Sequence, residues 1–118
     1  MGAHTIFGTA RGTTAEKAYN QAVSVARSQY GTDPYNGTVS TFNGYEEIRA
    51  PKGSRRMTRM NAIYTIFAND DLTETQINKY RLAGFMVNRI QNTGEKWERV
   101  GMMRLNKNEF LFWGWAAS

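Results

Sequence analysis

Two extended runs near the end of the chain decide the fold: Trp97-Glu-Arg-Val-Gly-Met-Met-Arg-Leu105 and Phe110-Leu-Phe-Trp-Gly-Trp115. The polar residues Asn106-Lys-Asn-Glu109 join them, which predicts a hairpin of two antiparallel strands. Because side chains alternate along a strand, one face of the second run carries Phe110, Phe112 and Gly114, and the other carries Leu111, Trp113 and Trp115. We expect the row with the two tryptophans to be buried or to form a dimer interface; the alternative is an exposed surface that contacts protein or bases.

The first strand and the first helix are also marked in the sequence. Residues 4–9 are rich in β-branched and aromatic types and predict a short strand that runs into a glycine-bounded turn, residues 8–12. Thr13 and Glu16 have the spacing of a capping box, which predicts the start of a helix. Apolar residues then recur every three or four positions, and Gly31 suits the position after the last turn.

The middle of the chain contains two short extended runs and an ambiguous segment. Residues 38–42 and 45–48 flank Asn43-Gly44, a pair typical of hairpin turns, so we expect these runs to pair. In residues 57–68, Met57, Met60, Tyr64 and Phe67 have helical spacing, whereas residues 62–67 have a strand-like composition. We favour a helix for this segment.

Residues 73–92 predict another helix, which Asp70, Asp71 and Thr73 can cap and which Asn92 and Gly94 close. The order of strand, helix, strands, helix and hairpin indicates an α+β fold, an antiparallel sheet with two or three helices packed on one face. A chain of 118 residues fits a single domain, residues 1–118, which we expect to fold alone or as a small homo-oligomer.

The composition excludes several kinds of catalytic site. The chain has no cysteine, so it forms neither disulfides nor thiolate metal sites, and His4 is its only histidine, which excludes a multi-histidine metal site. The acidic pairs Glu46-Glu47 and Asp70-Asp71 flank turns, where solvated carboxylates are common. We therefore expect a protein that is not an enzyme and that uses no metal and no cofactor, with a catalytic His4 as the less favoured alternative.

The start of the chain lacks the basic and long apolar regions of a signal peptide. No apolar run approaches the roughly 20 residues of a membrane span. We expect a soluble protein that stays inside the cell and has no membrane partner.

The net charge is concentrated in residues 49–59. This segment holds five basic side chains and no acidic one, whereas the rest of the chain carries ten of each sign. Pro51, Gly53 and Ser54 interrupt it, which predicts a mobile loop that attracts anions. The residues that we expect to contact phosphates are Arg49, Lys52, Arg55, Arg56 and Arg59.

Two neighbouring features add candidate ligand contacts. Tyr35 and Tyr45 lie close in sequence to the basic loop and are candidates for stacking on bases. Between Gly8 and Gly12, backbone amides and Arg11 could hold an anion at the start of the helix. A plain turn from strand to helix is the favoured interpretation of that segment, because the sequence lacks the lysine and spacing of a P-loop.

Parts of the chain resemble small accessory proteins encoded by tailed bacteriophages. The segments that carry the resemblance are Gly8-Thr-Ala-Arg-Gly-Thr-Thr-Ala-Glu-Lys-Ala-Tyr19, Tyr30-Gly-Thr-Asp-Pro-Tyr-Asn-Gly-Thr-Val-Ser-Thr41, Lys96-Trp97 and the ending Phe110-Leu-Phe-Trp-Gly-Trp-Ala116. The basic loop lies outside them. The resemblance implies an accessory protein in the cytoplasm of an infected bacterium, where counter-defence and host takeover are common roles.

These observations lead to two functional hypotheses. The first is a non-enzymatic binder of a phosphate-bearing ligand, either nucleic acid or a nucleotide signal, that acts in counter-defence or host takeover. The second is an inhibitor that binds an acidic surface, or the nucleic-acid groove, of a host defence protein. An enzyme that acts on nucleotides is a third and weaker alternative.

Overall fold

The structure is a computed structural model that describes residues 2–69 and 71–118. Its strands are β1 (Ala3–Arg11), β2 (Tyr45–Glu47), β3 (Val100–Asn106) and β4 (Glu109–Ala117). Its helices are α1 (Ala15–Tyr30), the 3-10 helix η1 (Val39–Thr41), α2 (Arg56–Ala68), α3 (Glu74–Leu82) and α4 (Val87–Gln91). The strands form one sheet in the order β1-β4-β3-β2, in which β2 and β3 are parallel and the other neighbours are antiparallel. The predicted α+β class is confirmed.

The C-terminal hairpin of β3 and β4 is confirmed. Lys107 and Asn108 form its turn, and Met102 lies opposite Phe112. The alternation along β4 is also as predicted, because Phe110 and Trp113 belong to separate hydrophobic clusters on the two faces of the sheet. The tryptophan-containing row is mostly buried, since Leu111 and Trp113 are inaccessible and Trp115 is partly buried.

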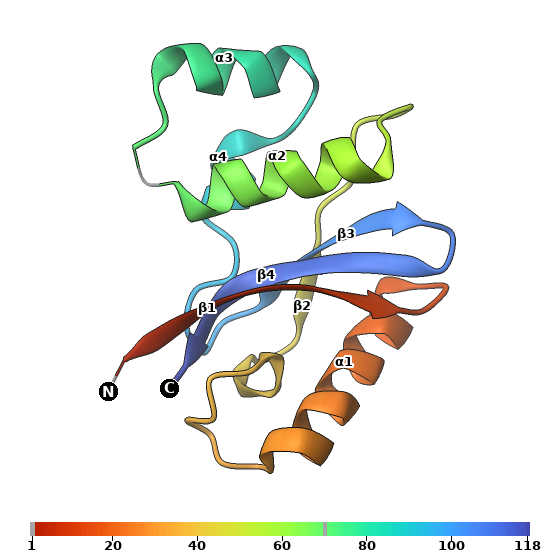
Figure 1. Cartoon of the computed structure of the whole chain (residues 1–118), viewed down its shortest axis with the longest axis vertical. Coiled ribbons are helices and arrows are strands. Elements are labelled where there is room, and N and C mark those ends of the chain that lie inside the picture. Colours follow the sequence, from red (N-terminus) through yellow and green to blue (C-terminus); the bar gives the residue numbers. More distant parts are fainter. Residues whose placement is uncertain (1, 70) are drawn as a thin grey trace.

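The helices cover both faces of the sheet (Figure 1). α1 packs on one face, in a cluster that includes Met102 and Phe110. α2 and α4 pack on the other face, in a cluster that includes Met103 and Leu111. The expected arrangement, with all helices on one face, is not confirmed. Because β3 and β4 are apolar on both faces, each face needs a cover to keep its side chains from water.

The connection from β1 to α1 is shorter than the sequence suggested. β1 continues through Gly8 to Arg11, so the expected turn across residues 8–12 is not formed. The N-cap of α1 is Thr14 rather than Thr13, and its hydroxyl accepts a hydrogen bond from the Lys17 backbone N–H at 3.2 Å. The predicted end of the helix is confirmed, because Gly31 has a φ of 80° and donates to the Arg27 carbonyl.

Residues 38–42 form no strand, contrary to the sequence prediction. The Thr38 hydroxyl accepts from the Ser40 backbone N–H at 3.3 Å and caps η1, while the Asn36 amide donates to Ser40 Oγ at 3.1 Å. Such local side-chain bonds compete with a strand ladder for the backbone. The predicted hairpin about Asn43-Gly44 is therefore wrong, and β2 pairs with β3 instead.

The segment 57–68 is helical, as favoured, but its predicted apolar stripe is buried only in part, at Phe67 and partly at Met60. Met57 and Tyr64 are exposed, and the buried side chains of α2 are Ala62, Ile63, Ile66 and Phe67. Since α2 begins at Arg56, the basic loop ends at Arg55, earlier than the sequence suggested.

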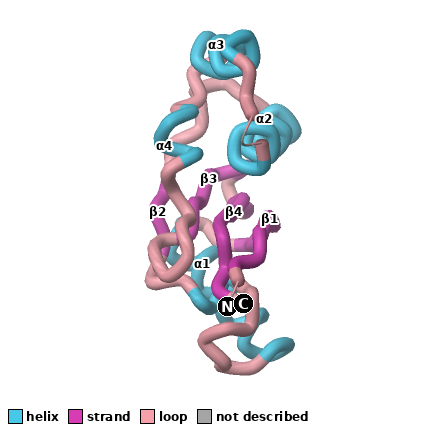
Figure 2. Tube along the Cα trace, turned by 90° about the vertical axis from the view of Figure 1, so that its left-hand side faces the viewer, coloured by secondary structure: helices cyan, strands magenta, loops and turns pink. Residues whose placement is uncertain are grey.

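The helix predicted over 73–92 is split into α3 and α4. Thr73 and Gln76 form a capping box at the start of α3, whereas Asp70 lies outside the described residues. Gly84, with a φ of 91°, follows the end of α3 and redirects the chain. α3 lies at the far end of the molecule from α1 (Figure 2), and none of its side chains is buried. Within residues 2–69 and 71–118, no helix is long and apolar enough to cross a membrane.

Candidate functional site

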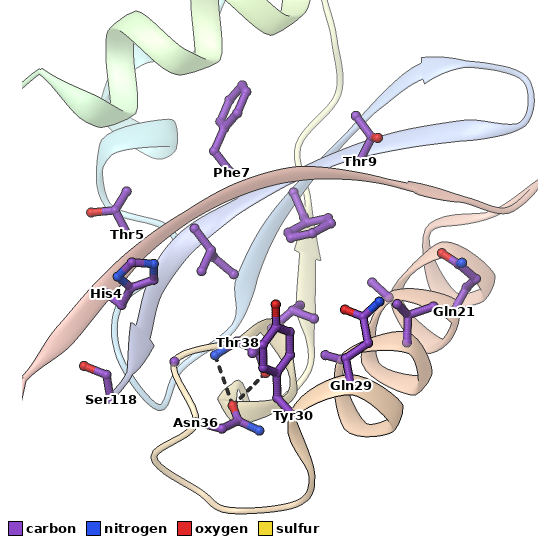
Figure 3. Close-up of a pocket in the computed structure, with 17 residues that line it drawn as sticks. His4, Thr5, Phe7, Thr9, Gln21, Gln29, Tyr30, Asn36, Thr38 and Ser118 are labelled. Atoms are coloured by element: carbon purple, nitrogen blue, oxygen red, sulfur yellow. Dashed lines mark hydrogen bonds between the residues drawn. The ribbon is translucent and has the colours of Figure 1, made fainter.

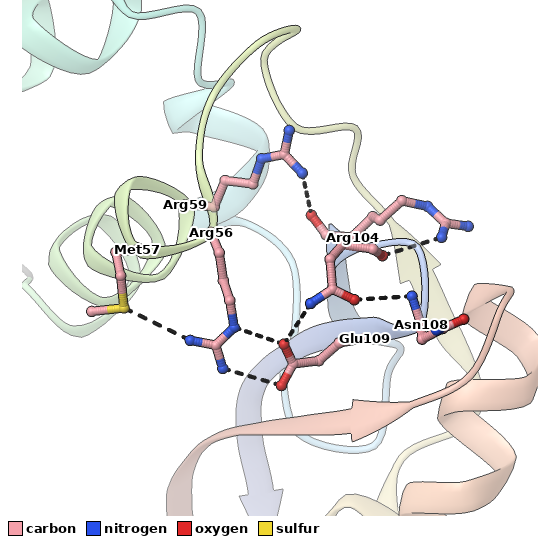
Figure 4. Close-up of polar contacts among 7 residues, drawn as sticks. Arg56, Met57, Arg59, Arg104, Asn108 and Glu109 are labelled. Atoms are coloured by element: carbon pink, nitrogen blue, oxygen red, sulfur yellow. Dashed lines mark hydrogen bonds and ion pairs between the residues drawn. The ribbon is translucent and has the colours of Figure 1, made fainter.

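The turn between β3 and β4 brings charged residues from distant parts of the chain together (Figure 4). The strand register places Arg11, at the end of β1, opposite Glu109, at the start of β4. The Asn106 side chain donates to Glu109 Oε1 at 3.1 Å and accepts from the Asn108 backbone N–H at 2.9 Å. These bonds hold the turn in one shape and orient the Glu109 carboxylate.

Arg56 and Glu109 form a two-point ion pair that joins α2 to β4. Arg56 Nε lies 2.7 Å from Glu109 Oε1, and Arg56 Nη2 lies 3.1 Å from Oε2. The hydrogen bond from the guanidinium lowers the pKa of Glu109, and the same bond raises the pKa of Arg56. Because two guanidinium nitrogens of Arg56 bond to the two oxygens of Glu109, this pair helps to position the start of α2.

Two further arginines donate to uncharged acceptors at the same turn. Arg59 Nη1 donates to the Arg104 carbonyl at 2.9 Å, and its Nε donates to Ser54 Oγ at 2.8 Å. Arg104 Nη2 donates to the Thr13 carbonyl at 2.8 Å, and its guanidinium lies 4.6 Å from the centre of the Phe110 ring. Since these acceptors carry no net charge, both arginines keep their positive charge for interaction with an outside anion.

We call this region the basic end; it consists of Arg11, Arg56, Arg59, Arg104 and Lys107, and it continues into the loop before α2. In that loop Arg55 directly precedes Arg56, and Lys52 is exposed further out, next to Pro51, which lies close to Gly84. Among the described residues, Glu109 is the carboxylate that contacts these cations. Both α1 and α2 begin at this end of the molecule (Figure 1), so the positive ends of their dipoles add to the charge. α2 also begins without a side-chain cap at Arg55.

The structure brings part of the predicted binding set together. Arg56 and Arg59 lie in the first turn of α2, and Arg11 joins them from β1. Arg49, Lys52 and Arg55 are exposed on the loop that precedes α2. Arg11 therefore belongs to the same surface as the loop, although the anion-binding glycine turn proposed around it is not formed.

The two tyrosines predicted to stack on bases lie elsewhere. Tyr45 is partly buried, and its ring centre lies 5.3 Å from that of Tyr19. Tyr35 follows the C-terminal end of α1 and meets the Trp97 ring edge-on at 5.3 Å. α1 begins at the basic end and has 16 residues, which span about 24 Å. Tyr35 thus lies far from the cations, and Tyr45 lies opposite Val100, four residues along β3 from Arg104.

Sequence reasoning missed Arg104 and Lys107, which belong to the C-terminal hairpin and are far along the chain from the basic loop. A signal was present, because Arg104 is a charged residue in an otherwise apolar run and Lys107 occupies the hairpin turn. The alternation of side chains along the two strands predicted the hairpin, but it did not predict that the hairpin turn would contact the start of α2.

The candidates for catalysis are dispersed. His4 is exposed at the start of β1, and the seven steps of extended chain to Arg11 span about 23 Å. Glu46 accepts from Arg89 Nε at 3.0 Å and from Thr93 Oγ1 at 3.3 Å, which ties β2 to the region of α4. Within the part of the chain that the structure describes, no group of three or more His, Asp or Glu side chains could hold a metal ion.

Comparison with known proteins gives no family for this chain. No protein-family model matches it, and neither the curated proteins nor the solved structures include one with significant similarity to it.

Proposed function

We propose that this protein is a non-enzymatic binder of a phosphate-bearing ligand and that it uses the basic end for binding. The observation that carries the proposal is the convergence of cations from β1, the basic loop, α2 and the hairpin on a region where one carboxylate contacts them. Phosphates are bound in proteins by arginine and lysine side chains, and clustering raises the local potential that attracts a polyanion.

The shape of the surface favours a polymer such as DNA or RNA over a small nucleotide. A small ligand is usually held in a concave pocket that buries most of its surface. The groove beside α1 and a smaller cavity next to Glu46 and Arg99 are both lined by residues outside the basic end. A nucleic-acid backbone needs no such pocket, because its phosphates can lie across a convex cationic surface.

The cations divide into two groups with different roles. Arg56, Arg59 and Arg104 make hydrogen bonds within the protein and hold the hairpin and the helix starts together. Arg11, Lys52, Arg55 and Lys107 are exposed, and in the described chain their side chains make no hydrogen bond. The exposed group is the one that we expect to contact phosphates directly, and the bonded group sets its position.

The biological setting is taken from the resemblance to phage accessory proteins. We propose that nucleic-acid binding serves counter-defence or host takeover in an infected bacterial cell. The runner-up hypothesis uses the same surface, because an acidic face of a host defence protein would also be attracted to a concentrated positive charge.

The test is a titration of a fluorescent DNA duplex of about 20 base pairs with the full chain at several salt concentrations. We compare wild type with Lys52→Gln/Arg55→Gln and with the control Arg27→Gln/Lys96→Gln, which removes the same residue types away from the basic end. The loop variant should bind more weakly and should lower the slope of log affinity against log salt by about 2, since up to two phosphate contacts are lost.

The control should match wild type within about twofold, because its charges act only at long range and salt screens them. No binding of DNA or RNA at low salt would contradict the proposal and leave the acidic protein face as the better hypothesis. Equal losses in the loop variant and the control would show that net charge, and not the basic end, determines binding.

A further inference from the structure

β1 lies at the edge of the sheet, and its outer side carries unpaired backbone groups. Gly2 and Ser118 exchange two hydrogen bonds of 3.2 Å, so the even-numbered residues of β1 bond to β4. In an antiparallel ladder the intervening residues point the other way. The outward N–H and C=O groups include those of Thr5, Phe7 and Thr9, and no described residue bonds to them.

A side chain of α1 already occupies one of these outward positions. The backbone N–H of Arg11 donates to Gln21 Oε1 at 3.3 Å. Gln21 therefore replaces the missing neighbour strand at the last residue of β1. The next outward groups along the edge, from Thr9 to Thr5, have no such substitute in the described chain.

A groove of about 700 Å³ runs between this edge and α1 (Figure 3). Ile6 and Phe112 line it from the sheet, and Val25 and Gln29 line it from α1. The segment 36–39 also contributes to its wall. No Asp, Glu, Lys or Arg side chain lines the groove, although charged residues are common in the rest of the chain.

We propose that an extended, uncharged peptide segment of a partner protein binds in this groove as a fifth strand. Its backbone pairs with Thr5, Phe7 and Thr9, which requires about five residues. Alternate side chains enter the groove beside Val25, which is 43% exposed. The others lie on the opposite face of the sheet, beside Tyr64, which is 59% exposed and meets the Phe7 ring edge-on at 5.4 Å.

The neutral lining selects the chemistry of the segment. A charged side chain that enters the groove would lose hydration and would meet no Asp, Glu, Lys or Arg side chain in the lining, which is unfavourable. Apolar side chains would cover Val25 and Tyr30, and uncharged polar ones could bond to Gln29 or His4. β1 itself offers little protection against such pairing, since residues 3–10 include neither proline nor an Asp, Glu, Lys or Arg side chain.

A lone segment fits this edge better than a second copy of the chain. Tyr64 of α2 contacts Phe7, so α2 lies over the edge strand on the face opposite α1 (Figure 2). Pairing two copies through β1 would place their strands about 4.8 Å apart, whereas packed helices need about 8–10 Å between axes. The two α2 helices would therefore collide before the strands could pair.

The test uses the peptide acetyl-Ser-Val-Thr-Val-Thr-Val-Ser-amide, titrated into the isotope-labelled full chain and followed by nuclear magnetic resonance. We expect shifts and slower hydrogen exchange at the amides of Thr5, Phe7 and Thr9, and no change at the basic end. Thr9→Pro removes an outward N–H but no bond to β4, and it should weaken binding about tenfold. Thr9→Val keeps the N–H and should bind like wild type.

Three results would overturn the proposal. One is the absence of amide changes at Thr5, Phe7 and Thr9 at about 1 mM peptide, a concentration that detects even weak binding. Another is equal binding by Thr9→Pro and Thr9→Val. The third is a rise in mass with protein concentration that Thr9→Pro abolishes, which would assign the edge to a second copy.

A second variant covers the case in which Thr9→Pro does not fold. Val25→Glu leaves β1 unchanged and places a carboxylate on the exposed α1 wall of the groove. It should weaken binding of the same peptide at least about tenfold, because the valines of the peptide would bury that charge. Unchanged binding by Val25→Glu would exclude the groove as the site.

Discussion

Glu109 stabilises the fold but reduces the positive charge of the basic end. Its carboxylate lies within a cluster of cations and forms a two-point pair with Arg56, so it joins α2 to the hairpin. The same carboxylate cancels part of the positive charge that we propose attracts nucleic acid. Replacing it should therefore change stability and binding in opposite directions.

Glu109→Gln should lower the melting temperature at neutral pH and tighten binding of DNA. The pKa of Glu109 is lower in the folded protein, mainly because Arg56 donates to the carboxylate. Its stabilisation is hence fully present above the unfolded pKa and is lost as the pH falls through the folded pKa. The gap in melting temperature between wild type and Glu109→Gln should close as the pH falls through the acidic range, measured by circular dichroism.

The control for this measurement is Glu98→Gln, which removes an exposed carboxylate for which the described chain provides no side-chain partner. A gap between wild type and Glu109→Gln that stays constant down to acidic pH would show that the ion pair does not stabilise the fold.

At the scale of elements, the start of α2 combines two functions that a mutation can separate. Arg55 occupies the N-cap position with extended backbone angles, φ −93° and ψ 161°, but its side chain makes no capping bond. A serine at this position could accept from the first-turn amides and would remove one cation from the basic end.

Arg55→Ser should stabilise the protein by about 1 kcal/mol and weaken DNA binding, whereas Arg55→Ala should weaken binding similarly without the gain in stability. Urea unfolding and the fluorescence titration measure the two effects separately. If Arg55→Ser and Arg55→Ala unfold at the same urea concentration, α2 does not use residue 55 as its cap.

The same scale shows what local sequence can and cannot predict. The hairpin and α1 depend on alternation, periodicity and a cap, which are local, and these predictions are confirmed, as is the helical nature of residues 57–68. The strand predicted for residues 38–42 failed because Asn36, Thr38 and Ser40 bond to one another. The single-face arrangement was not confirmed because apolar side chains on both faces of β3 and β4 require helices on both.

At the scale of the whole molecule, the candidate site could be predicted only in part. The charge of residues 49–59 is visible in the sequence, and the loop residues Lys52 and Arg55 remain exposed. Arg11 and Lys107 lie at the same end of the molecule because of the register of β1 with β4. Only the folded chain defines that register. The groove beside β1 was not predicted at all, because an edge strand is defined by the order of the sheet.

The molecule measures 41 × 33 × 18 Å, and its two proposed binding surfaces meet only at the end of β1. The basic end lies at the hairpin turn and the helix starts, whereas the groove follows the outer edge of β1 and the face of α1 toward Tyr30. Arg11 lies near both, because its backbone N–H already bonds to Gln21 and its side chain belongs to the basic end.

The two surfaces should bind independently, because they share no side chain that we expect to contact both ligands. One molecule could then bridge a nucleic acid and a partner peptide. With the seven-residue peptide at saturation, the affinity for the DNA duplex should stay within about twofold of its value without peptide, because an uncharged ligand leaves the charge of the basic end unchanged. Lys52→Gln/Arg55→Gln should likewise leave peptide affinity unchanged. A change of tenfold or more in DNA affinity, about 1.4 kcal/mol of coupling, would instead show that the ligands compete or cooperate through Arg11 at the end of β1.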